Sequence, residues 1–447
     1  MGRNPTKVAR GRRPRRRSGA QAAWLLSLMG LFVLVLTASG GSPSAGVAQS
    51  SSSGQSAKVS LTEEDYYGAP SPTSTAPGYL LNFFKSYSKS HPGVTITRQA
   101  PVSATYDTHV LSQFSSGSEP DLLMLDNPEL PDFASTGGLV PLRSLGSVDT
   151  SGINKANLAE TTYNKKLYAL PLYTNTIAIF YNKQILQQGG VTTLPQTWSE
   201  FSADAKKLSN GSHYGFVFSG QAGPGQATWQ WDPWAWSNGG QMWTPAAKAD
   251  VQALSFLTSL VQEGAAPKDV VNWSQAQPIQ NFEAGKAAFV ENGLWNIPTM
   301  QSQFSNLQWG AFQIPTRVAG QTVIAPFGGE VWCIPRTTPA KEKAAFQLLK
   351  AMSTSSNIIP LAKGLSDVPT NTSLWHQDPW STQPYAPFLT ELKHGRARTD
   401  LVGSKEPEVD LAVGDAIQSA LAGNQSPQAA MQQAQQTVNK DLGKNYG

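Results

Sequence analysis

The sequence predicts an α/β protein built on mostly parallel sheets, because short apolar runs alternate along it with segments of helical periodicity. Several runs lack polar alternation, which is typical of strands buried on both faces. No segment repeats with a period of about 20 to 50 residues, so the pattern does not indicate a solenoid or propeller. A first strand begins near Val59, and the later predicted strands are residues 94–99, 121–126, 176–182, 214–219, 286–292 and 310–315.

The first 57 residues predict export. Residues 1–19 carry eight basic side chains and no acid, and an uncharged apolar run follows at 22–38. This order predicts a signal peptide or an N-terminal membrane anchor within residues 1–38. Residues 39–57 have the Ser- and Gly-rich composition of a flexible linker. We therefore expect the remainder of the chain outside the cytoplasm.

The net charge of +4 comes from this basic arm, and the rest of the chain is acidic on balance. It lacks the clustered basic face that phosphate backbones need, so we expect no nucleic-acid partner.

The predicted helices have recognisable ends. Thr197 and Glu200 have the spacing of a capping box, and Gly211 is a stop signal. Further helices are expected to start at Thr244-Pro245 and end at Gly264, to start at Thr338-Pro339, and to cover residues 409–421 and 427–442.

Motifs of enzyme and metal chemistry are lacking in the sequence. It contains no HExxH, GxSxG or Walker loop, and its five histidines have no ligand spacing. The single cysteine, Cys333, is expected to be a buried thiol in a strand. We expect no metal, no cofactor and no catalysis, although a glycosidase carboxylate pair would leave no mark in a sequence.

Six motifs occur in an order that resembles a known family. They are "SEPDLLMLDNPELPDFASTGGLVPL", "NKKLYALPLYTNTIAIFYNK", "LPQTWSEFSADAKKL", "SNGGQMW", "NFEAGKAAFVENGLWNIP" and "FGGEVWCIPRTTPAKEKAAFQLLKAM". Together they resemble family 1 of the extracellular solute-binding proteins, the carbohydrate-type binding proteins of ABC importers. The sequence departs from that pattern at Ser39, which stands where a lipidated cysteine would be expected.

The resemblance implies a type II periplasmic-binding-protein-like fold, with two α/β lobes joined by hinge segments. We place the crossings near Pro171, Pro315 and Ser353. The N-terminal lobe is then residues 58–170 and 316–352, and the C-terminal lobe is residues 171–315 and 353–447. The resemblance also implies a protein that holds a mono- or oligosaccharide between its lobes and delivers it to an ABC permease. We expect it to be a monomer.

A sugar site needs flat apolar surfaces for the C–H faces of the ring and paired polar groups for its hydroxyls. Residues 228–243 hold five tryptophans, and the nearby glycines and proline predict a loop there. The resemblance makes Trp236 and Trp243 packing residues and places Trp295 at the ligand. The predicted ligand-binding residues are Tyr66, Tyr67, Asp126, Asn127, Asn175, Trp229, Trp231, Asp232, Trp234, Trp295, Gly328, Gly329, Glu330 and Arg398.

Three alternatives remain open from the sequence. A protein of the same fold that binds a glycerophosphodiester or polyol phosphate would need a cationic site, and Arg398 is the candidate. An extracellular glycoside hydrolase would need two facing carboxylates. A membrane-anchored sugar sensor would retain its N-terminal segment.

Overall fold

The computed structural model describes residues 58–69, 75–101, 106–399 and 402–444. The predicted export segment and linker lie outside these residues. Within the described part of the chain, no helix is long and apolar enough to cross a membrane.

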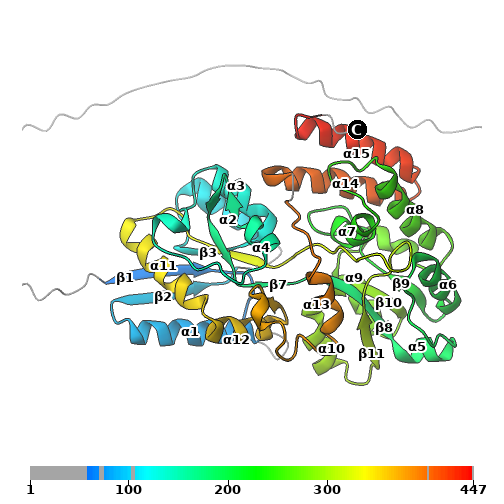
Figure 1. The fold of residues 1–447 in the computed structure, drawn as a ribbon, viewed down its shortest axis with the longest axis horizontal. Helices are drawn as coiled ribbons and strands as arrows, with labels where there is room; N and C mark the ends of the chain where they lie inside the picture. Colours follow the sequence, from blue (N-terminus) through cyan, green and yellow to red (C-terminus); the bar gives the residue numbers. More distant parts are fainter. Residues whose placement is uncertain (1–57, 70–74, 102–105, 400–401, 445–447) are drawn as a thin grey trace, which may run out of the picture. The chain divides into compact units, whose positions relative to one another are not determined.

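The first lobe is organised around a five-stranded sheet with the order β2-β1-β3-β12-β6. β1 is parallel to β2 and β3, whereas β12 is antiparallel to β3 and β6. The strand β12 reaches this sheet from far along the sequence (Figure 1). The strands are β1 (Val59–Glu64), β2 (Val94–Gln99), β3 (Leu122–Asp126), β6 (Ala169–Pro171) and β12 (Glu330–Cys333).

The second lobe is organised around a four-stranded sheet with the order β11-β8-β10-β9. Its strands are β8 (Ile177–Asn182), β9 (Tyr214–Val217), β10 (Ala287–Gly293) and β11 (Trp309–Phe312). Only β9 and β10 are parallel, because β8 is antiparallel to both of its neighbours. The α/β class is confirmed, but the prediction of mostly parallel sheets is wrong. Each sheet is mixed, since it receives a strand from a segment that has crossed between the lobes.

Helices cover both sheets (Figure 1). Those of the first lobe are α1 (Ala76–Ser90), α2 (Tyr106–Ser116), α3 (Leu130–Ser135), α4 (Lys155–Glu160), α11 (Pro339–Met352) and α12 (Ser355–Leu365). Those of the second lobe are α5 (Lys183–Gln188), α6 (Trp198–Leu208), α7 (Ala227–Ser237), α8 (Lys248–Gln262), α9 (Ala276–Glu283), α10 (Ile297–Gln303), α13 (Ala386–Leu392), α14 (Glu406–Leu421) and α15 (Pro427–Asp441).

The capping and stop residues in the sequence correctly predicted the ends of several helices. In α6 the Glu200 amide donates to Thr197 Oγ1 at 3.3 Å and the Thr197 amide donates to Glu200 Oε2 at 3.0 Å, which confirms the capping box. The helix ends at Leu208, before Gly211. Helix α11 begins at Pro339 as predicted, whereas α8 begins at Lys248, later than Thr244-Pro245 indicated.

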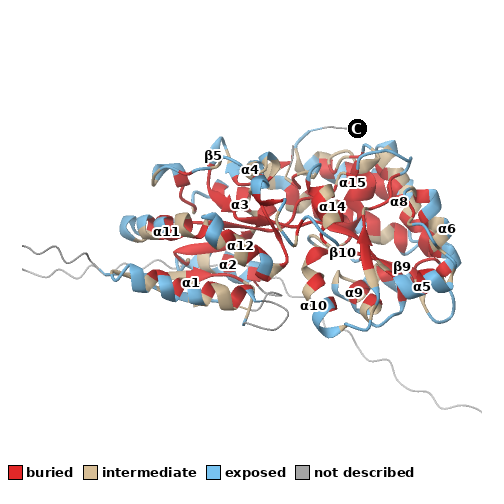
Figure 2. Cartoon of the chain, turned by 60° about the horizontal axis from the view of Figure 1, so that its bottom comes forward, coloured by how far each residue is buried: buried red, intermediate tan, exposed pale blue. Residues whose placement is uncertain are grey.

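Alternating strand residues pack into different cores. In β3, Leu122 and Met124 join one apolar cluster, whereas Leu123 and Leu125 join another on the opposite face of the sheet. Buried residues accordingly run through both lobes, and exposed ones lie on the outer helical faces (Figure 2). Cys333 is fully buried in β12, which confirms its predicted placement.

Several segments cross between the lobes. The short strands β7 (Tyr173–Thr174) and β13 (Val368–Pro369) pair antiparallel, Asn175 pairs with Gly328, and Pro326 pairs with Arg396. The first crossing lies between β6, which ends at Pro171 in the first sheet, and β8, which begins at Ile177 in the second. The return crossing lies near 326–329 instead of Pro315, since the preceding residues still pack on the second lobe.

The boundary predicted at Ser353 places α12 with the second sheet, but the structure places it in the first lobe. Helix α12 packs on α1, and the Tyr79 hydroxyl donates to Asn357 Oδ1 at 2.9 Å. The chain enters the second lobe only after β13, since α13 contacts β8 and β11.

Candidate functional site

A cavity of about 460 Å³ lies where the two lobes and the crossing segments meet. Ligands of α/β proteins collect beyond the carboxyl ends of strands, and residues following β1 and ending β3 contribute here. The predicted residues that line it are Tyr66, Tyr67, Asp126, Asn175, Trp229, Trp295, Gly328, Gly329, Glu330 and Arg398. The residues of the lining that the sequence did not predict are Pro224, Gly225, Gln226, Gln275, Leu365 and Asp367.

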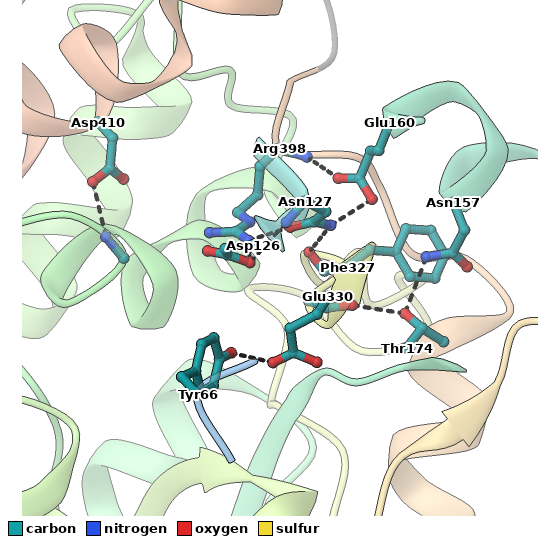
Figure 3. Close-up of polar contacts among 12 residues, drawn as sticks. Tyr66, Asp126, Asn127, Asn157, Glu160, Thr174, Phe327, Glu330, Arg398 and Asp410 are labelled. Atoms are coloured by element: carbon teal, nitrogen blue, oxygen red, sulfur yellow. Dashed lines mark hydrogen bonds and ion pairs between the residues drawn. The ribbon is translucent and has the colours of Figure 1, made fainter. Parts of the chain in front are cut away.

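Glu330 is the acceptor at the centre of a tyrosine network. The hydroxyl of Tyr66 donates to Glu330 Oε1 (Figure 3). The hydroxyl of Tyr67 donates to Glu330 Oε2 at 2.8 Å. The hydroxyls of Tyr67 and Tyr173 also share a hydrogen bond. Burial raises the pKa of Glu330, while the hydrogen bonds from the two tyrosines favour the ionised form. The network therefore joins the end of β1, β7 and β12 around one carboxylate.

Arg398 joins the two lobes. Its Nη2 donates to Oδ1 of Asp126, the last residue of β3, at 2.7 Å, and to Oδ1 of Asn127, the next residue (Figure 3). Its guanidinium carbon lies 4.7 Å from the centre of the Trp229 ring in α7, and its backbone amide donates to Glu160 Oε1 at 3.1 Å. Burial lowers the pKa of Arg398, but the nearby carboxylates outweigh burial and the net shift is upward. The residue is therefore a permanent cation that positions a carboxylate and an indole together.

Two indoles from the second lobe, those of Trp229 and Trp295, form an apolar wall of the cavity. Trp295 lies against Gly293, where an added Cβ would come within 2.0 Å of the indole ring. Trp229 lies against Gly328 in the same way, with 2.7 Å between its ring and the Cβ position, and that Cβ would also come within 2.1 Å of Asn175 Oδ1. Gly329 has φ of +102°, a conformation that L side chains rarely adopt. Gly293 and Gly328 therefore allow the two rings to lie close to the backbone, and Gly329 lies against the backbone of residues 173–175.

The remaining predicted residues do not line the cavity. Asn127 lies behind it, where its Nδ2 donates to Glu160 Oε2 at 2.5 Å and its Oδ1 accepts from Arg398. Trp231, Asp232 and Trp234 are buried in the core of the second lobe, at 0%, 1% and 0% exposure.

The prediction of a loop over the tryptophan-rich stretch is wrong, because residues 227–237 form α7 with Pro233 inside the helix. A helix that is apolar all round is a buried one, and α7 packs between α8 and α14. Its indoles therefore serve different purposes: Trp229 faces the cavity, while Trp234 donates from Nε1 to Glu291 Oε2 at 2.9 Å in the core. Trp236 is buried in that core and Trp243 packs against it, as predicted.

The lining residues that the sequence did not predict come from two short segments, 224–226 and 365–367, and from the single position Gln275. Gln226 and Gln275 hold each other in place, since the Gln275 amide donates to Gln226 Oε1 at 3.0 Å and its Nε2 donates to the Gly225 carbonyl at 2.6 Å. The Gly-Pro-Gly turn before the tryptophan-rich helix was a usable loop signal. Nothing in the sequence around Asp367 marked it.

Among the described residues, no group of three or more His, Cys, Asp or Glu side chains is arranged to hold a metal ion. The arrangement is therefore one of hydrogen-bonding groups and aromatic rings around a cavity.

Comparisons with known proteins show to which family the chain belongs. The sequence profile of the bacterial extracellular solute-binding proteins matches residues 82–387, more than half of the chain. The chain belongs to this family. Members act outside the cytoplasm, so this solute-binding protein is extracytoplasmic.

Individual relatives have low sequence identity to this chain, but the aligned regions cover most of it. A putative binding protein of Brucella abortus is 22% identical over 280 residues, which cover 60% of this chain and 66% of that protein, just under two thirds. The galactooligosaccharide-binding protein of Bacillus subtilis is 22% identical over 349 residues, 72% of this chain and 77% of that protein. The crystal structure of the cyclic alpha-maltosyl-1,6-maltose binding protein from Arthrobacter globiformis superposes with a TM-score of 0.74 at 21% identity, covering 86% of this chain and 99% of that one. This last likeness confirms the two-lobed fold.

Proposed function

We propose that this solute-binding protein captures a mono- or oligosaccharide in the interlobe cavity and delivers it to the permease of an ABC transporter. The observation that carries the proposal is the lining itself. Trp295 offers a half-buried flat surface and Trp229 a second ring that is 4% exposed, while side chains such as Asn175, Gln226 and Gln275 offer hydrogen-bond donors and acceptors. Covering one sugar face with an indole removes a few tens of Å² from water, worth about 1 kcal/mol at about 25 cal/mol/Å².

The names of the relatives support the same ligand class. One is named for binding galactooligosaccharides and the structural neighbour for binding a cyclic maltose derivative. A cavity of this volume lies within the usual range for small-molecule sites, about 300–1,000 Å³. We infer that the protein acts as a monomer and that the N-terminal segment either directs secretion or holds the protein at the membrane.

The phosphate-binding alternative is disfavoured by the charge of the lining. It contains the carboxylates of Asp126, Glu330 and Asp367 but a single cation, Arg398, which is already paired with Asp126 at 2.7 Å. A phosphate would therefore meet three carboxyl groups and only one cation of the lining, which is already paired.

The test is a thermal-shift screen against a sugar panel, followed by calorimetry. A ligand present at 100 times its Kd adds about 2.7 kcal/mol to the free energy of unfolding. In the variant Trp295→Ala, we expect the affinity for the identified sugar to fall at least tenfold while the protein stays folded. Trp243→Ala is the matched control, because Trp243 is also half-buried but lies outside the cavity lining.

Unchanged affinity in Trp295→Ala would remove that residue from the site, and a panel without any stabilising sugar would contradict the proposal. Incubating the protein with the identified oligosaccharide also addresses the hydrolase alternative, which requires new reducing ends to appear.

A further inference from the structure

Two carboxylates on the cavity wall have no basic partner. Glu330 is 8% exposed and Asp367 is 3% exposed, and both line the cavity. Within the described ranges neither forms an ion pair, and the only cation of the lining, Arg398, is bound to Asp126. The Oδ1 atom of Asp367 is buried without any hydrogen-bond partner. The wall therefore holds two carboxyl groups, and acceptor capacity, for which the protein itself supplies no cation.

Such a pair is unfavourable when the cavity is empty. Burial, followed by the charge of Glu330, raises the pKa of Asp367 well above its usual value. A buried carboxylate without a cation is costly, and a second one beside it increases that cost. A bound group that carries positive charge and several N–H donors would relieve both problems, whereas a sugar hydroxyl supplies one donor and no charge.

The neighbouring rings fit the same kind of group. Tyr66, Tyr67 and Trp295 line the cavity, and aromatic faces attract ammonium groups. One face of Trp229 already carries the guanidinium of Arg398, so the protein uses this interaction at the same site.

We propose that the ligand is a saccharide with a protonated primary amine, an aminodeoxy sugar, whose ammonium group binds between Glu330 and Asp367. This inference rests on the proposed sugar-binding function and names the ligand class for the same cavity. The tyrosine hydroxyls orient Glu330, and the ammonium donates to both carboxylates.

The experiment compares saccharides that differ only at C2. The probes are glucosamine, its N-acetyl form and glucose, each as the monosaccharide and as the β-1,4-linked dimer, with the galactose and mannose equivalents. Calorimetry at about pH 6 keeps the amine protonated, since an ordinary α-amino group has a pKa of about 8. We expect the amines to bind at least tenfold more tightly than the N-acetyl and hydroxyl forms. Added salt should reduce this preference.

The variant Asp367→Asn should lower the affinity for amines at least tenfold, to that of the neutral sugars measured on the same variant. Glu330→Gln is a second variant that retains an acceptor for a tyrosine hydroxyl and should have the same effect. Glu391→Gln is the matched control, since Glu391 is a buried carboxylate outside the cavity lining, and it should keep the preference. Circular dichroism establishes that each variant is folded.

The outcomes separate the inference from the proposed function. Neutral saccharides that bind as tightly as the amines, or that alone bind, would overturn the inference and leave the sugar-binding function standing. A preference that survives in both Asp367→Asn and Glu330→Gln would also overturn it. If no saccharide of either class binds, both proposals fail.

Discussion

Replacing Arg398 by lysine separates its charge from its geometry. The guanidinium bonds Asp126 and Asn127 and stacks on Trp229, so it contacts both lobes. Lysine keeps the positive charge but has one compact ammonium, which cannot reach both acceptors and cover the indole at once. The variant therefore tests whether positioning, and not charge alone, prepares the cavity.

The magnitude follows from the contacts that are lost. One charge-assisted hydrogen bond contributes about 1.5–3 kcal/mol, and a cation over an aromatic ring contributes about 0.5–1 kcal/mol or more. Asp126 has a side chain that is 42% exposed, so solvent screens part of the loss. We expect the free energy of unfolding to fall by about 2 kcal/mol. Because Asp126 and Trp229 also lose their fixed positions, sugar affinity should fall at least tenfold.

Chemical denaturation measures the first quantity and calorimetry with the identified sugar measures the second. Arg396→Lys is the matched control, because Arg396 lies two residues earlier, stacks on Trp236 and Trp243 at 5.0 and 4.8 Å, and does not line the cavity. It should lower stability without changing affinity by more than about threefold. Equal losses of affinity in the two variants would refute a positioning role for Arg398.

Two further predictions concern the backbone at the cavity and the buried acids. Gly328→Ala should lower sugar affinity more than tenfold in a folded protein, because the new Cβ would lie 2.1 Å from Asn175 Oδ1; calorimetry with unchanged affinity would contradict this. Burial raises the pKa of Glu160 and of Asp250 to about 8, so the folded state holds protons that the unfolded state releases. Stability is therefore greatest below the unfolded pKa values of about 4 and is lost as pH rises towards about 8. Thermal unfolding should show a loss of at least about 1 kcal/mol across this window from these two groups, and Asp250→Asn should flatten the profile.

The sequence predicted the strands well because their information is local. Apolar runs of the right length mark β2, β3, β8 and β10 to within a residue or two. The direction in which a strand runs within its sheet is not encoded by the local sequence, however. Strand β12 enters the first sheet antiparallel to β3 only because the chain has already visited the other lobe. The same reason explains why α12 packs on α1, far from the place that its position in the sequence suggested.

Residue type and family position pointed to Trp295, and the Gly328-Gly329 pair pointed to its neighbour Glu330; both line the cavity. The tryptophan-rich stretch shows the limit of that approach. Its glycines and proline favoured a loop, but burial of an apolar surface on all sides stabilises a helix despite Pro233. Once the helix forms, its orientation about its own axis determines which indole faces the cavity. Trp229 lines the cavity, and Trp231 lies in the core. That rotation depends on packing against α8 and α14, which no local pattern encodes.

The division of the lining between lobes has a consequence for how binding is signalled. The first lobe contributes Tyr66, Tyr67 and Glu330, and the second contributes Trp229 and Trp295. A ligand favours the closed arrangement only through contacts that it makes with both walls. The tyrosine network is held by bonds within the first lobe and its crossing strand, so its acceptor is oriented independently of the second lobe. The free energy of closure must then come from ligand contacts with the second lobe, which are those of the indoles, Gln226 and Gln275. We therefore expect Trp295→Ala to weaken ligand-induced closure, measured by small-angle scattering at saturating sugar, more than a change on the tyrosine side of equal cost in affinity.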